Sequence, residues 1–441
     1  MTISYANRLS LYWGLYCIFF AVSAFSEIRS GTIAQEERWT KEKSPYEIKA
    51  SLTIPAGVTV TVNPGVDIRL DVGVGITVKG YWNAAGTKEE LIRFLPNTKE
   101  RWGAISFDEQ GAGRLAYCTF QHGSAGGGAR IGMVNAYQCV GAVTIADSTF
   151  TDWPDDFSRK AFYAYEAQHV EIRRCFFGEG TNEGIYTEQT PIVVESNTFA
   201  ARKGYSDAVD VGYIHRPGPI PLIRKNVFFG SEDDAIDLDH VDAIAEGNWI
   251  MNCRGGSHDP IGISGDQADT HPVIVNNVII NCESGIGFKN GADITVINNT
   301  IINCDRGIWM HQQPSHATVL NTLIWGRDDQ QSIRLEPGST IDIRYSIIRG
   351  APIYPGEGNQ NQSPRFGDPE HFDFHLLPDS PAIDAGLGAT DVPMRDFDDF
   401  PRVDVSSIVN TGKGNPPYVD IGAFEYQVIP APIRDWWLNA R

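Results

Sequence analysis

The sequence predicts an all-β solenoid, because two short phrases alternate at regular spacing between residues 226 and 310. One phrase is an asparagine followed by apolar residues, and it recurs at Asn226, Asn248, Asn277 and Asn299, with intervals of 22, 29 and 22 residues. The other is a small residue, then Ile, one further residue and an apolar residue, at 235–238, 285–288 and 307–310. A period near 22 residues is typical of stacked repeats. The phrases are rich in Val, Ile, Thr and Phe and too short for helices, so each predicts a strand.

Short strands with an Asn at one place in every coil resemble the right-handed parallel β-helix. We expect about ten to twelve coils of this kind. An inward Asn in each turn would hydrogen-bond the coils above and below it and form a ladder. A β-sandwich also has short, regular strands, but it gives no reason for the same residue to return every 22 positions.

The first 24 residues read as a secretory signal peptide, with Arg8, an apolar stretch over 9–20 and the small residues 22–24 before a cleavage point. An uncleaved anchor is the alternative. The signal predicts a secreted, extracellular or cell-surface protein with no transmembrane anchor after cleavage.

The mature chain divides into three predicted parts. Residues 25–105 include IPAGVTVTVNPGVDIRL and resemble the N-terminal cap and first coils of many secreted β-helix proteins. Residues 106–350 carry the repeats. Residues 351–441, with LLPDSPAIDAG and VDIGAFEY, resemble a small module common after secreted β-helices, which we expect to cap the last coil. Caps are needed because an open solenoid end exposes strand edges and core.

The net charge limits the possible binding partners, and the cysteine spacing predicts where the thiols lie. The 441 residues carry a net charge of −19, which weighs against nucleic acid and anionic membranes. A polysaccharide partner and a monomeric state are expected. Cys253, Cys282 and Cys304 share one phase and predict a buried thiol ladder, although pairing between neighbouring coils stays open. We expect the charged residues of the C-terminal module to form structural ion pairs and turn bonds, namely Asp384, Asp396, Arg402, Asp420 and Glu425.

Strand alternation predicts one face with two outward columns. Ile236 and Leu238 point inward, so Asp237 and Asp239 point outward. Aligning the coils places Tyr186, Asp210, Asp237, Ser264, Gly287, Trp309 and Arg334 in the first column, and Glu188, Gly212, Asp239, Asp266, Lys289, His311 and Glu336 in the second. The coil at 259–266 can be aligned in two ways that differ by two residues, and the alignment used takes Gly262-Ile263 as the small residue and the inward Ile.

The acidic part of this face predicts a cation site. Neighbouring coils lie about 4.8 Å apart, so carboxylates on successive coils must take up protons or share a cation. Oxygen ligands alone suit Ca²⁺, and no His/Cys grouping suggests zinc. The alternative is a solvated acidic surface. The candidate ligands are Asp207, Asp210, Asp233, Asp234, Asp237 and Asp239.

Basic and aromatic residues follow along the same face. Breaking a polyuronate by β-elimination needs a cation that acidifies the C5 proton, a base that removes it and a group that stabilises the developing enolate. Lys289, His311 and Arg334 are the candidate catalytic residues, and Trp309 could stack on a sugar ring. Asp266 and Tyr186 are further candidate substrate contacts.

Asp233-Asp234-x-x-Asp237, preceded by Asp207 and Asp210, resembles the calcium motif of the family 9 pectate lyases. The resemblance implies that Asp210 or Asp207 binds Ca²⁺ with these three residues, and that Lys289 is the base. Lys289 sits further along the chain than the family's spacing, and the stretch equally resembles β-helix repeats that have no assigned chemistry.

Three functions remain from the sequence. The first is a secreted Ca²⁺-dependent polysaccharide lyase acting on an acidic, uronate-containing glycan. The second is a non-catalytic β-helix protein that binds glycan or Ca²⁺. The third is a glycoside hydrolase, with Asp237 and Asp266 as the two carboxylates.

Overall fold

The computed structural model describes residues 26–427, except 126–127, 154–157, 181, 205, 256–258, 266–269 and 328–330. The predicted signal peptide and the C-terminal Trp436-Trp437 pair lie outside the described residues. Within the described part, no helix is long and apolar enough to cross a membrane.

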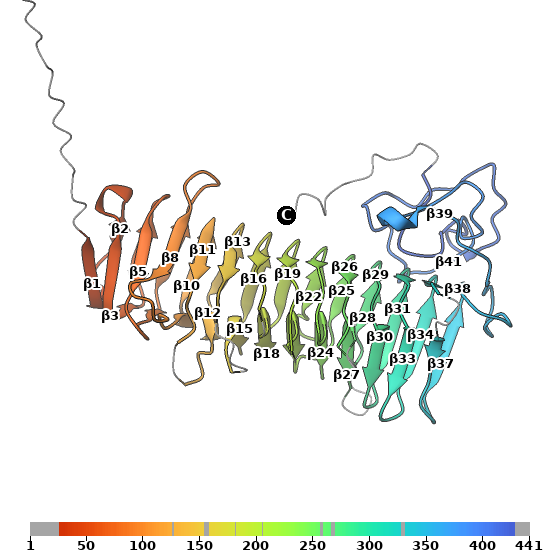
Figure 1. Ribbon diagram of the computed structural model, residues 1–441, viewed down its shortest axis with the longest axis horizontal. Coiled ribbons are helices and arrows are strands. Elements are labelled where there is room, and N and C mark those ends of the chain that lie inside the picture. Colours follow the sequence, from red (N-terminus) through yellow and green to blue (C-terminus); the bar gives the residue numbers. More distant parts are fainter. Residues whose placement is uncertain are drawn as a thin grey trace, which may run out of the picture.

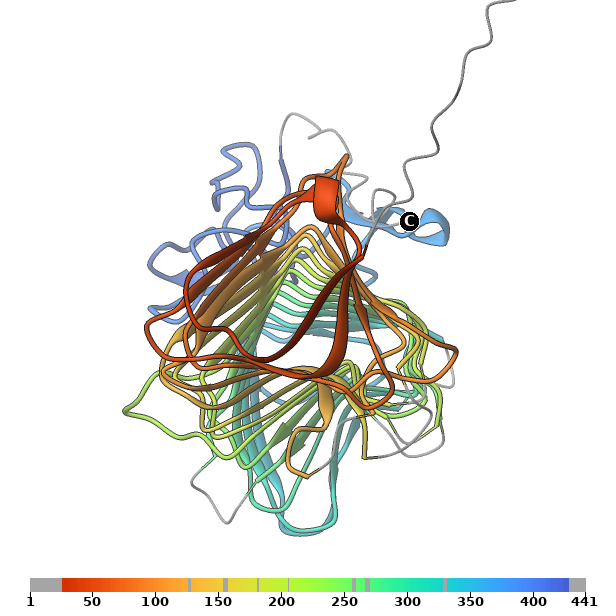
Figure 2. The ribbon, with the colours of Figure 1, turned by 90° about the vertical axis from the view of Figure 1, so that its left-hand side faces the viewer.

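The chain forms a right-handed parallel β-helix, as predicted. Figure 1 shows the strands stacked along the long axis, and Figure 2, seen down that axis, shows a roughly triangular section with a sheet on each side. One sheet has 13 strands, one for each coil, so the described coils slightly exceed the predicted ten to twelve. The other two sides belong to one 25-stranded sheet, which β1 (Glu27–Thr32) and β3 (Tyr46–Ile54) connect by pairing along both.

The three sides are named by what they carry. The site face contains β6 (Ile76–Val78), β9 (Ile105–Glu109), β12 (Gly132–Cys139), β15 (Lys160–Tyr165), β18 (Ile185–Glu188), β21 (Val209–Gly212), β24 (Ile236–Asp239), β27 (Ile261–Ser264), β30 (Ser284–Lys289), β33 (Arg306–His311) and β36 (Gln331–Arg334). The module face contains β5 (Asp67–Leu70), β8 (Ile92–Pro96), β11 (Cys118–Gln121), β14 (Thr149–Thr151), β17 (Phe176–Phe177), β20 (Thr198–Phe199), β23 (Val227–Phe228), β26 (Trp249–Met251), β29 (Val278–Ile280), β32 (Thr300–Ile302), β35 (Leu323–Trp325) and β38 (Ile347–Ile348). The third face contains β2 (Glu37–Trp39), β4 (Thr59–Val62), β7 (Tyr81–Ala85), β10 (Ala112–Ala116), β13 (Ala142–Ala146), β16 (His169–Arg173), β19 (Ile192–Glu195), β22 (Leu222–Arg224), β25 (Ile244–Glu246), β28 (Val273–Val275), β31 (Asp293–Ile297), β34 (His316–Leu320) and β37 (Thr340–Arg344).

Four shorter strands and two 3₁₀ turns complete the described elements. They are η1 (Lys41–Lys43), β39 (Phe366–Asp368), η2 (Pro369–His371), β40 (Asp373–Leu376), β41 (Leu387–Gly388) and β42 (Lys413–Gly414).

The core repeats the same side chain from coil to coil. Buried phenylalanines from Phe94 to Phe228 stack with ring centroids 4.7–4.9 Å apart. This spacing equals the distance between neighbouring parallel strands. Identical residues in successive coils can therefore pack ring on ring, which fixes the register of the stack.

The asparagine ladder is present. The backbone N–H of Asn226 donates to Oδ1 of Asn248 (3.1 Å), and that of Asn248 donates to Oδ1 of Asn277 (2.9 Å). Each side-chain amide also donates to a carbonyl of the preceding coil, as Asn277 does to Ala245 (2.9 Å). These asparagines are fully buried, so the ladder satisfies turn groups that water cannot reach.

The thiol prediction is confirmed. All six cysteines of the described chain are buried and free of disulfides. Cys253, Cys282 and Cys304 lie on successive coils, and the backbone N–H of Cys253 donates to Sγ of Cys282 (3.4 Å). They act as small core residues rather than as crosslinks.

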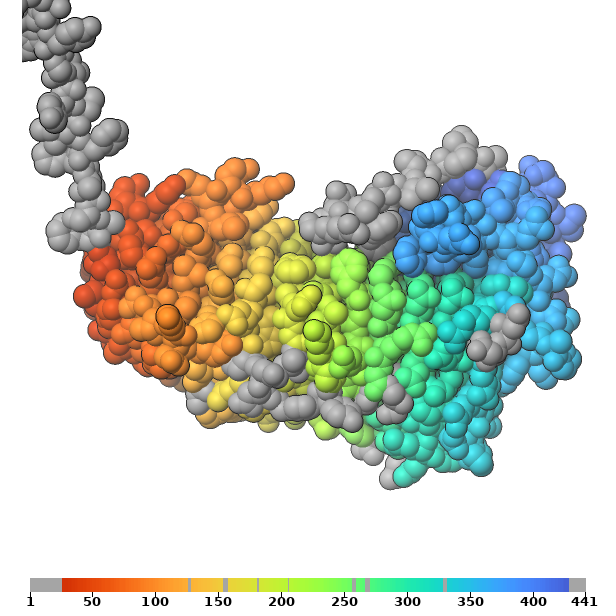
Figure 3. Space-filling view, viewed as in Figure 1, coloured from red at the N-terminus to blue at the C-terminus, as the bar shows by residue number. Residues whose placement is uncertain are grey.

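The first residues of the C-terminal segment, 354–360, cover the open edge of the last coil, since the carbonyls of Glu357 and Gln360 accept the backbone N–H groups of Tyr345 and Ile348. The rest of the segment lies along the module face (Figures 1 and 3), beyond the expected cap. Its Phe374, Ile383 and Phe424 pack on outward side chains of that face, including Trp249 and Ile280.

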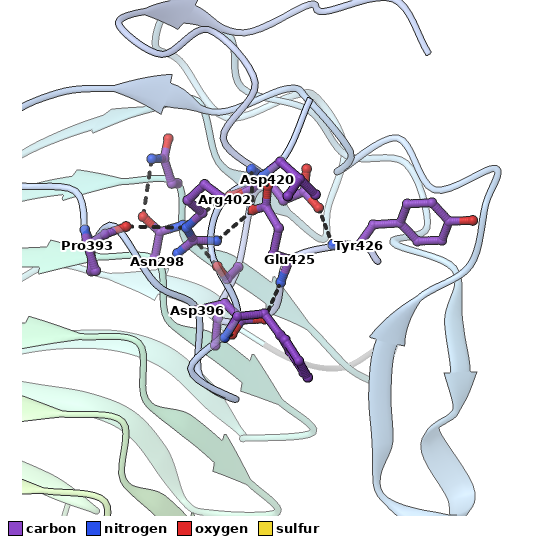
Figure 4. A network of polar contacts seen from close by, with 12 residues as sticks. Asn298, Pro393, Asp396, Arg402, Asp420, Glu425 and Tyr426 are labelled. Atoms are coloured by element: carbon purple, nitrogen blue, oxygen red, sulfur yellow. Dashed lines mark hydrogen bonds and ion pairs between the residues drawn. The ribbon is translucent and has the colours of Figure 1, made fainter. Parts of the chain in front are cut away.

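The charged residues of this segment form the predicted structural network (Figure 4). Buried Arg402 donates to Glu425 (2.9 Å), and Asp420 accepts the backbone N–H of Asp384 (2.7 Å). Asn298 on the solenoid donates to the carbonyl of Asp420 (3.0 Å). The network therefore joins the segment to the coils.

Candidate functional site

The structure contains both predicted outward columns, but the predicted alignment of one coil was wrong. Along the first column, Asp210 pairs with Asp237, Asp237 with Gly262, and Gly262 with Gly287. Ser264 therefore belongs to the second column, between Asp239 and Lys289, and not to the first. The predicted alignment was wrong by two residues in this coil, because Ile261 and Ile263 both fit an inward position and only strand pairing separates them. Ser264 takes the place beside Asp239 that was predicted for Asp266, which lies outside the described residues.

A third acidic column was missed by the sequence alignment. Glu183, Asp207, Asp234 and Asp259 each stand two residues before the first inward residue of a site-face strand, and all four are buried. The backbone N–H of Asp234 donates to Oδ1 of Asp207 (2.9 Å), and that of Asp259 donates to Oδ1 of Asp234 (2.6 Å). The correct register would have revealed this column, because Asp259 precedes Ile261 as Asp234 precedes Ile236.

Two glycines let this column lean over the sheet. A Cβ at Gly262 would overlap the carboxylate of Asp234, and a Cβ at Gly287 would overlap that of Asp259. The glycine positions of the first column are thus filled by carboxylates from the preceding turns. Acidic groups consequently follow one another along four neighbouring coils.

The carboxylates converge in two groups that share one residue. Oxygens of Asp207, Asp234 and Asp237 lie within 4.8 Å of one another, and so do oxygens of Glu183, Asp207 and Asp210. Burial, followed by the nearby Asp237 carboxylate, raises the pKa of Asp207, Asp210 and Asp234 well above the usual value. The pKa of Asp237 is also raised, mainly by burial and to a smaller extent by the negative charge of Asp239. Uptake of protons or binding of a cation would relieve the repulsion among these groups.

The donor set fits a calcium ion. Oδ1 of Asp237 is buried and has no hydrogen-bond partner in the described structure. Such an atom is costly unless a cation or proton meets it, and oxygen donors alone suit Ca²⁺. Asp207, Asp234 and Asp237 would hold it. Asp239 and Asp233 fall outside both groups of converging oxygens, although both were predicted ligands.

Basic residues continue the face beyond the acids. Lys289 lies two coils past Asp239, is half-buried, and forms no ion pair with the described residues. Its ammonium charge lowers the pKa of Asp237 against the effect of burial. His311 pairs with Lys289 in the next coil, and Arg334 stands one coil beyond Trp309.

Trp309 is more enclosed than a sugar platform requires. Its ring stacks on His311 with centroids 4.2 Å apart. The guanidinium groups of Arg306 and Arg334 lie 4.2 and 5.4 Å from its centroid. The residue is half-buried, so a sugar could reach only the part of the ring that these three side chains leave uncovered.

The opposite end of the acidic groups is closed by an ion pair. Lys160 and Glu183 are both buried and form a salt bridge, and the Lys160 ammonium lies 5.1 Å from the ring centroid of Tyr186. The Tyr186 hydroxyl donates to Glu188 (2.9 Å). Tyr186 was a predicted substrate contact, and its hydroxyl is already occupied.

Comparisons with known proteins address the fold. A curated relative, Protein bark beetle of Drosophila melanogaster, is 34% identical over 68 residues, which cover 15% of this chain and only 2% of that protein. Among solved structures, pectate lyase Pel9A is 15% identical, with 85% of this chain and 89% of that chain covered and a TM-score of 0.41. The periplasmic alginate epimerase AlgG is 12% identical, with 66% and 77% covered and a TM-score of 0.41. The family 6 alginate lyase AlyGC is 15% identical, with 72% and 53% covered and a TM-score of 0.39.

A family model matches the centre of the chain. Residues 221–361 match the model described as a right handed beta helix region. This stretch runs from β22 to the end of the last coil and contains β24, β27, β30 and β33 of the site face. Asp234, Asp237 and the basic residues beyond them lie inside the matched stretch, whereas Glu183, Asp207 and Asp210 precede it.

Proposed function

We propose that the site face is the active site of a Ca²⁺-dependent polysaccharide lyase that cleaves an acidic, uronate-containing glycan by β-elimination. One observation carries the proposal: a three-carboxylate group lies on the same face as a lysine that forms no ion pair with the described residues. The group is Asp207, Asp234 and Asp237, and Lys289 is close enough for its charge to lower the pKa of Asp237. The predicted signal peptide supports action outside the cell.

The residues have separate roles in this reaction. Asp207, Asp234 and Asp237 would hold Ca²⁺, which when bound neutralises the uronate carboxylate and makes the adjacent C5 proton more acidic. Lys289 in its neutral form accepts that proton. Arg334 offers a positive charge further along the site face for a second uronate. The cation also explains how a chain of charge −19 could bind a polyanion.

The test measures the unsaturated product, whose C4=C5 double bond conjugated to the carboxylate absorbs ultraviolet light. Polygalacturonate, pectins and alginate are incubated with the protein in Ca²⁺ and in EDTA. We expect product in Ca²⁺ only. Lys289→Ala should abolish it without changing the Ca²⁺-induced rise in melting temperature, and Lys203→Ala, which removes an exposed lysine, is the matched control. Product formation that persists in EDTA or in Lys289→Ala would refute the proposal.

One observation favours a second function, a calcium-stabilised β-helix that binds glycan without cleaving it. Asp207 and Asp234 each accept a backbone N–H from the following coil, so they join neighbouring coils as the ladder asparagines do, which accept from the preceding coil. Carboxylates in this role stabilise the stack whether or not chemistry occurs. The same assay decides: no product from any substrate, with Ca²⁺ still raising the melting temperature, would favour this function.

A further inference from the structure

Two contacts fix the imidazole ring of His311. Its Nε2 lies 3.4 Å from Oδ2 of Asp259, and its face stacks on Trp309 with an angle of 20° between the planes. The His311 side chain is only 13% exposed. Its Nδ1 has no hydrogen-bond partner in the described part of the chain. The ring is therefore held from two sides, with one nitrogen left for a ligand.

The surroundings of Asp259 hold its carboxylate next to His311. Its side chain is 5% exposed, its carboxylate lies over Gly287, and its backbone N–H is fixed by Asp234 (2.6 Å). Within the described residues, His311 is its only ion-pair partner, and Oδ1 of Asp259 has no hydrogen-bond partner. A buried carboxylate beside an imidazole orients the ring and stabilises a positive charge on it. The 3.4 Å separation is long for a hydrogen bond, but catalytic contacts commonly tighten when substrate binds.

The neighbouring coil places a base beside this pair. Lys289 and His311 are directly paired in the register of β30 and β33, and adjacent coils lie about 4.8 Å apart. In a β-elimination, the proton that leaves and the oxygen that receives one sit on adjacent carbons. An amine and an imidazole on adjacent coils match this requirement.

We propose that His311 is the general acid that protonates the leaving glycosidic oxygen, and that Asp259 is a positioning residue that orients it. This inference rests on the lyase function proposed above. The Lys289 amine takes the C5 proton, and the electron pair of the C5–H bond forms the C4=C5 double bond. The C4–O4 bond breaks, and O4 takes a proton from the His311 imidazolium. The protein is left with a Lys289 ammonium and a neutral imidazole, and proton exchange with water restores both.

Three variants and a control test the pair on the full-length protein. We expect His311→Gln to lower kcat by roughly 100-fold or more and Asp259→Asn by about tenfold, with KM nearly unchanged. The double variant should be no slower than His311→Gln alone, because Asp259 acts only through the ring. His169→Gln, which changes an exposed histidine on the third face, should behave as wild type. Independent losses that multiply in the double variant would overturn the role of Asp259.

A substrate with a better leaving group separates the acid from a structural role. In a uronate that carries a nitrophenyl group on O4, the leaving group is nitrophenolate, which departs without protonation. His311→Gln should therefore lose little rate on it while losing roughly 100-fold on the natural polymer. Equal losses on both substrates would refute the general-acid role. An active wild type with a fully active His311→Gln would overturn this inference and leave the proposed lyase intact, whereas an inactive wild type would overturn both.

Discussion

Replacing Asp237 with asparagine tests the cation site directly, because the expected change in stability reverses sign with Ca²⁺. Asp237 shares its group with Asp207 and Asp234, with oxygens within 4.8 Å of one another. Two unit charges at that distance repel by about 3 kcal/mol at an effective dielectric constant near 20. Protonation relieves part of this repulsion, so we expect Asp237→Asn to be about 1–2 kcal/mol more stable than wild type in EDTA.

Calcium should reverse that order. A ligand present at 100 times its Kd stabilises the folded state by about 2.7 kcal/mol. Wild type should gain about that amount, whereas the variant, which has lost one of three carboxylates, should gain less than about 1 kcal/mol under the same conditions. Wild type would then be the more stable protein in Ca²⁺.

Urea unfolding at neutral pH, followed by circular dichroism in EDTA and in Ca²⁺, measures both halves of the prediction. Asp239→Asn is the matched control, since it removes a carboxylate from the same strand but outside the three-carboxylate group. It should keep the full response to Ca²⁺. An Asp237→Asn variant that is less stable than wild type in EDTA, or that gains as much from Ca²⁺, would show that these carboxylates serve only the stack.

Three further predictions follow from contacts within the coils. Because the pKa values of the buried site carboxylates are raised in the fold, their contribution to stability in EDTA is full below the unfolded-state pKa and is lost as pH rises. The urea midpoint measured in EDTA should therefore decrease as the pH is raised above about 4. The gain from Ca²⁺ should grow over the same range, and a flat profile would contradict both. Asn277→Ala removes the acceptor of the buried N–H of Asn248 and the side-chain donor to the carbonyl of Ala245, and should cost about 2–4 kcal/mol in urea unfolding. A loss below about 1 kcal/mol would argue against the ladder. Gly287→Ala should displace the Asp259 carboxylate. It should cost about 1–3 kcal/mol of stability and slow the reaction as Asp259→Asn does. Gly218→Ala, whose Cβ meets only a carbonyl oxygen 3.9 Å away, is the control and should change neither stability nor rate.

Much of the fold was predictable because each coil repeats the environment of the last. Asn226, Asn248, Asn277 and Asn299 recur because only a side chain that both donates and accepts can join consecutive buried turns. The outward direction of Asp237 followed from the alternation of a strand, which local sequence alone sets. The buried positions of Cys253, Cys282 and Cys304 followed from a shared phase that points into the core.

The part of the site that escaped prediction depends on register between coils. Ile261 and Ile263 are both apolar, and a shift of two residues keeps every side chain on its face, so the hydrophobic pattern cannot choose between them. The choice decided whether Asp259 belonged to the acidic column. It also decided that Gly262 and Gly287 face carboxylates from the turns before them.

The sequence by itself determined the architecture, the acidic face and the order of acids before bases along it, because these depend on period and alternation. Only the tertiary structure decided which charged groups meet. Asp234 leans over Gly262, and Asp259 leans over Gly287 and reaches His311, because neither glycine has a Cβ to block the carboxylate. The position of the C-terminal segment was likewise decided by packing. Its apolar side chains match the outward apolar side chains of the module face, a complementarity between surfaces far apart in the chain that no local pattern encodes.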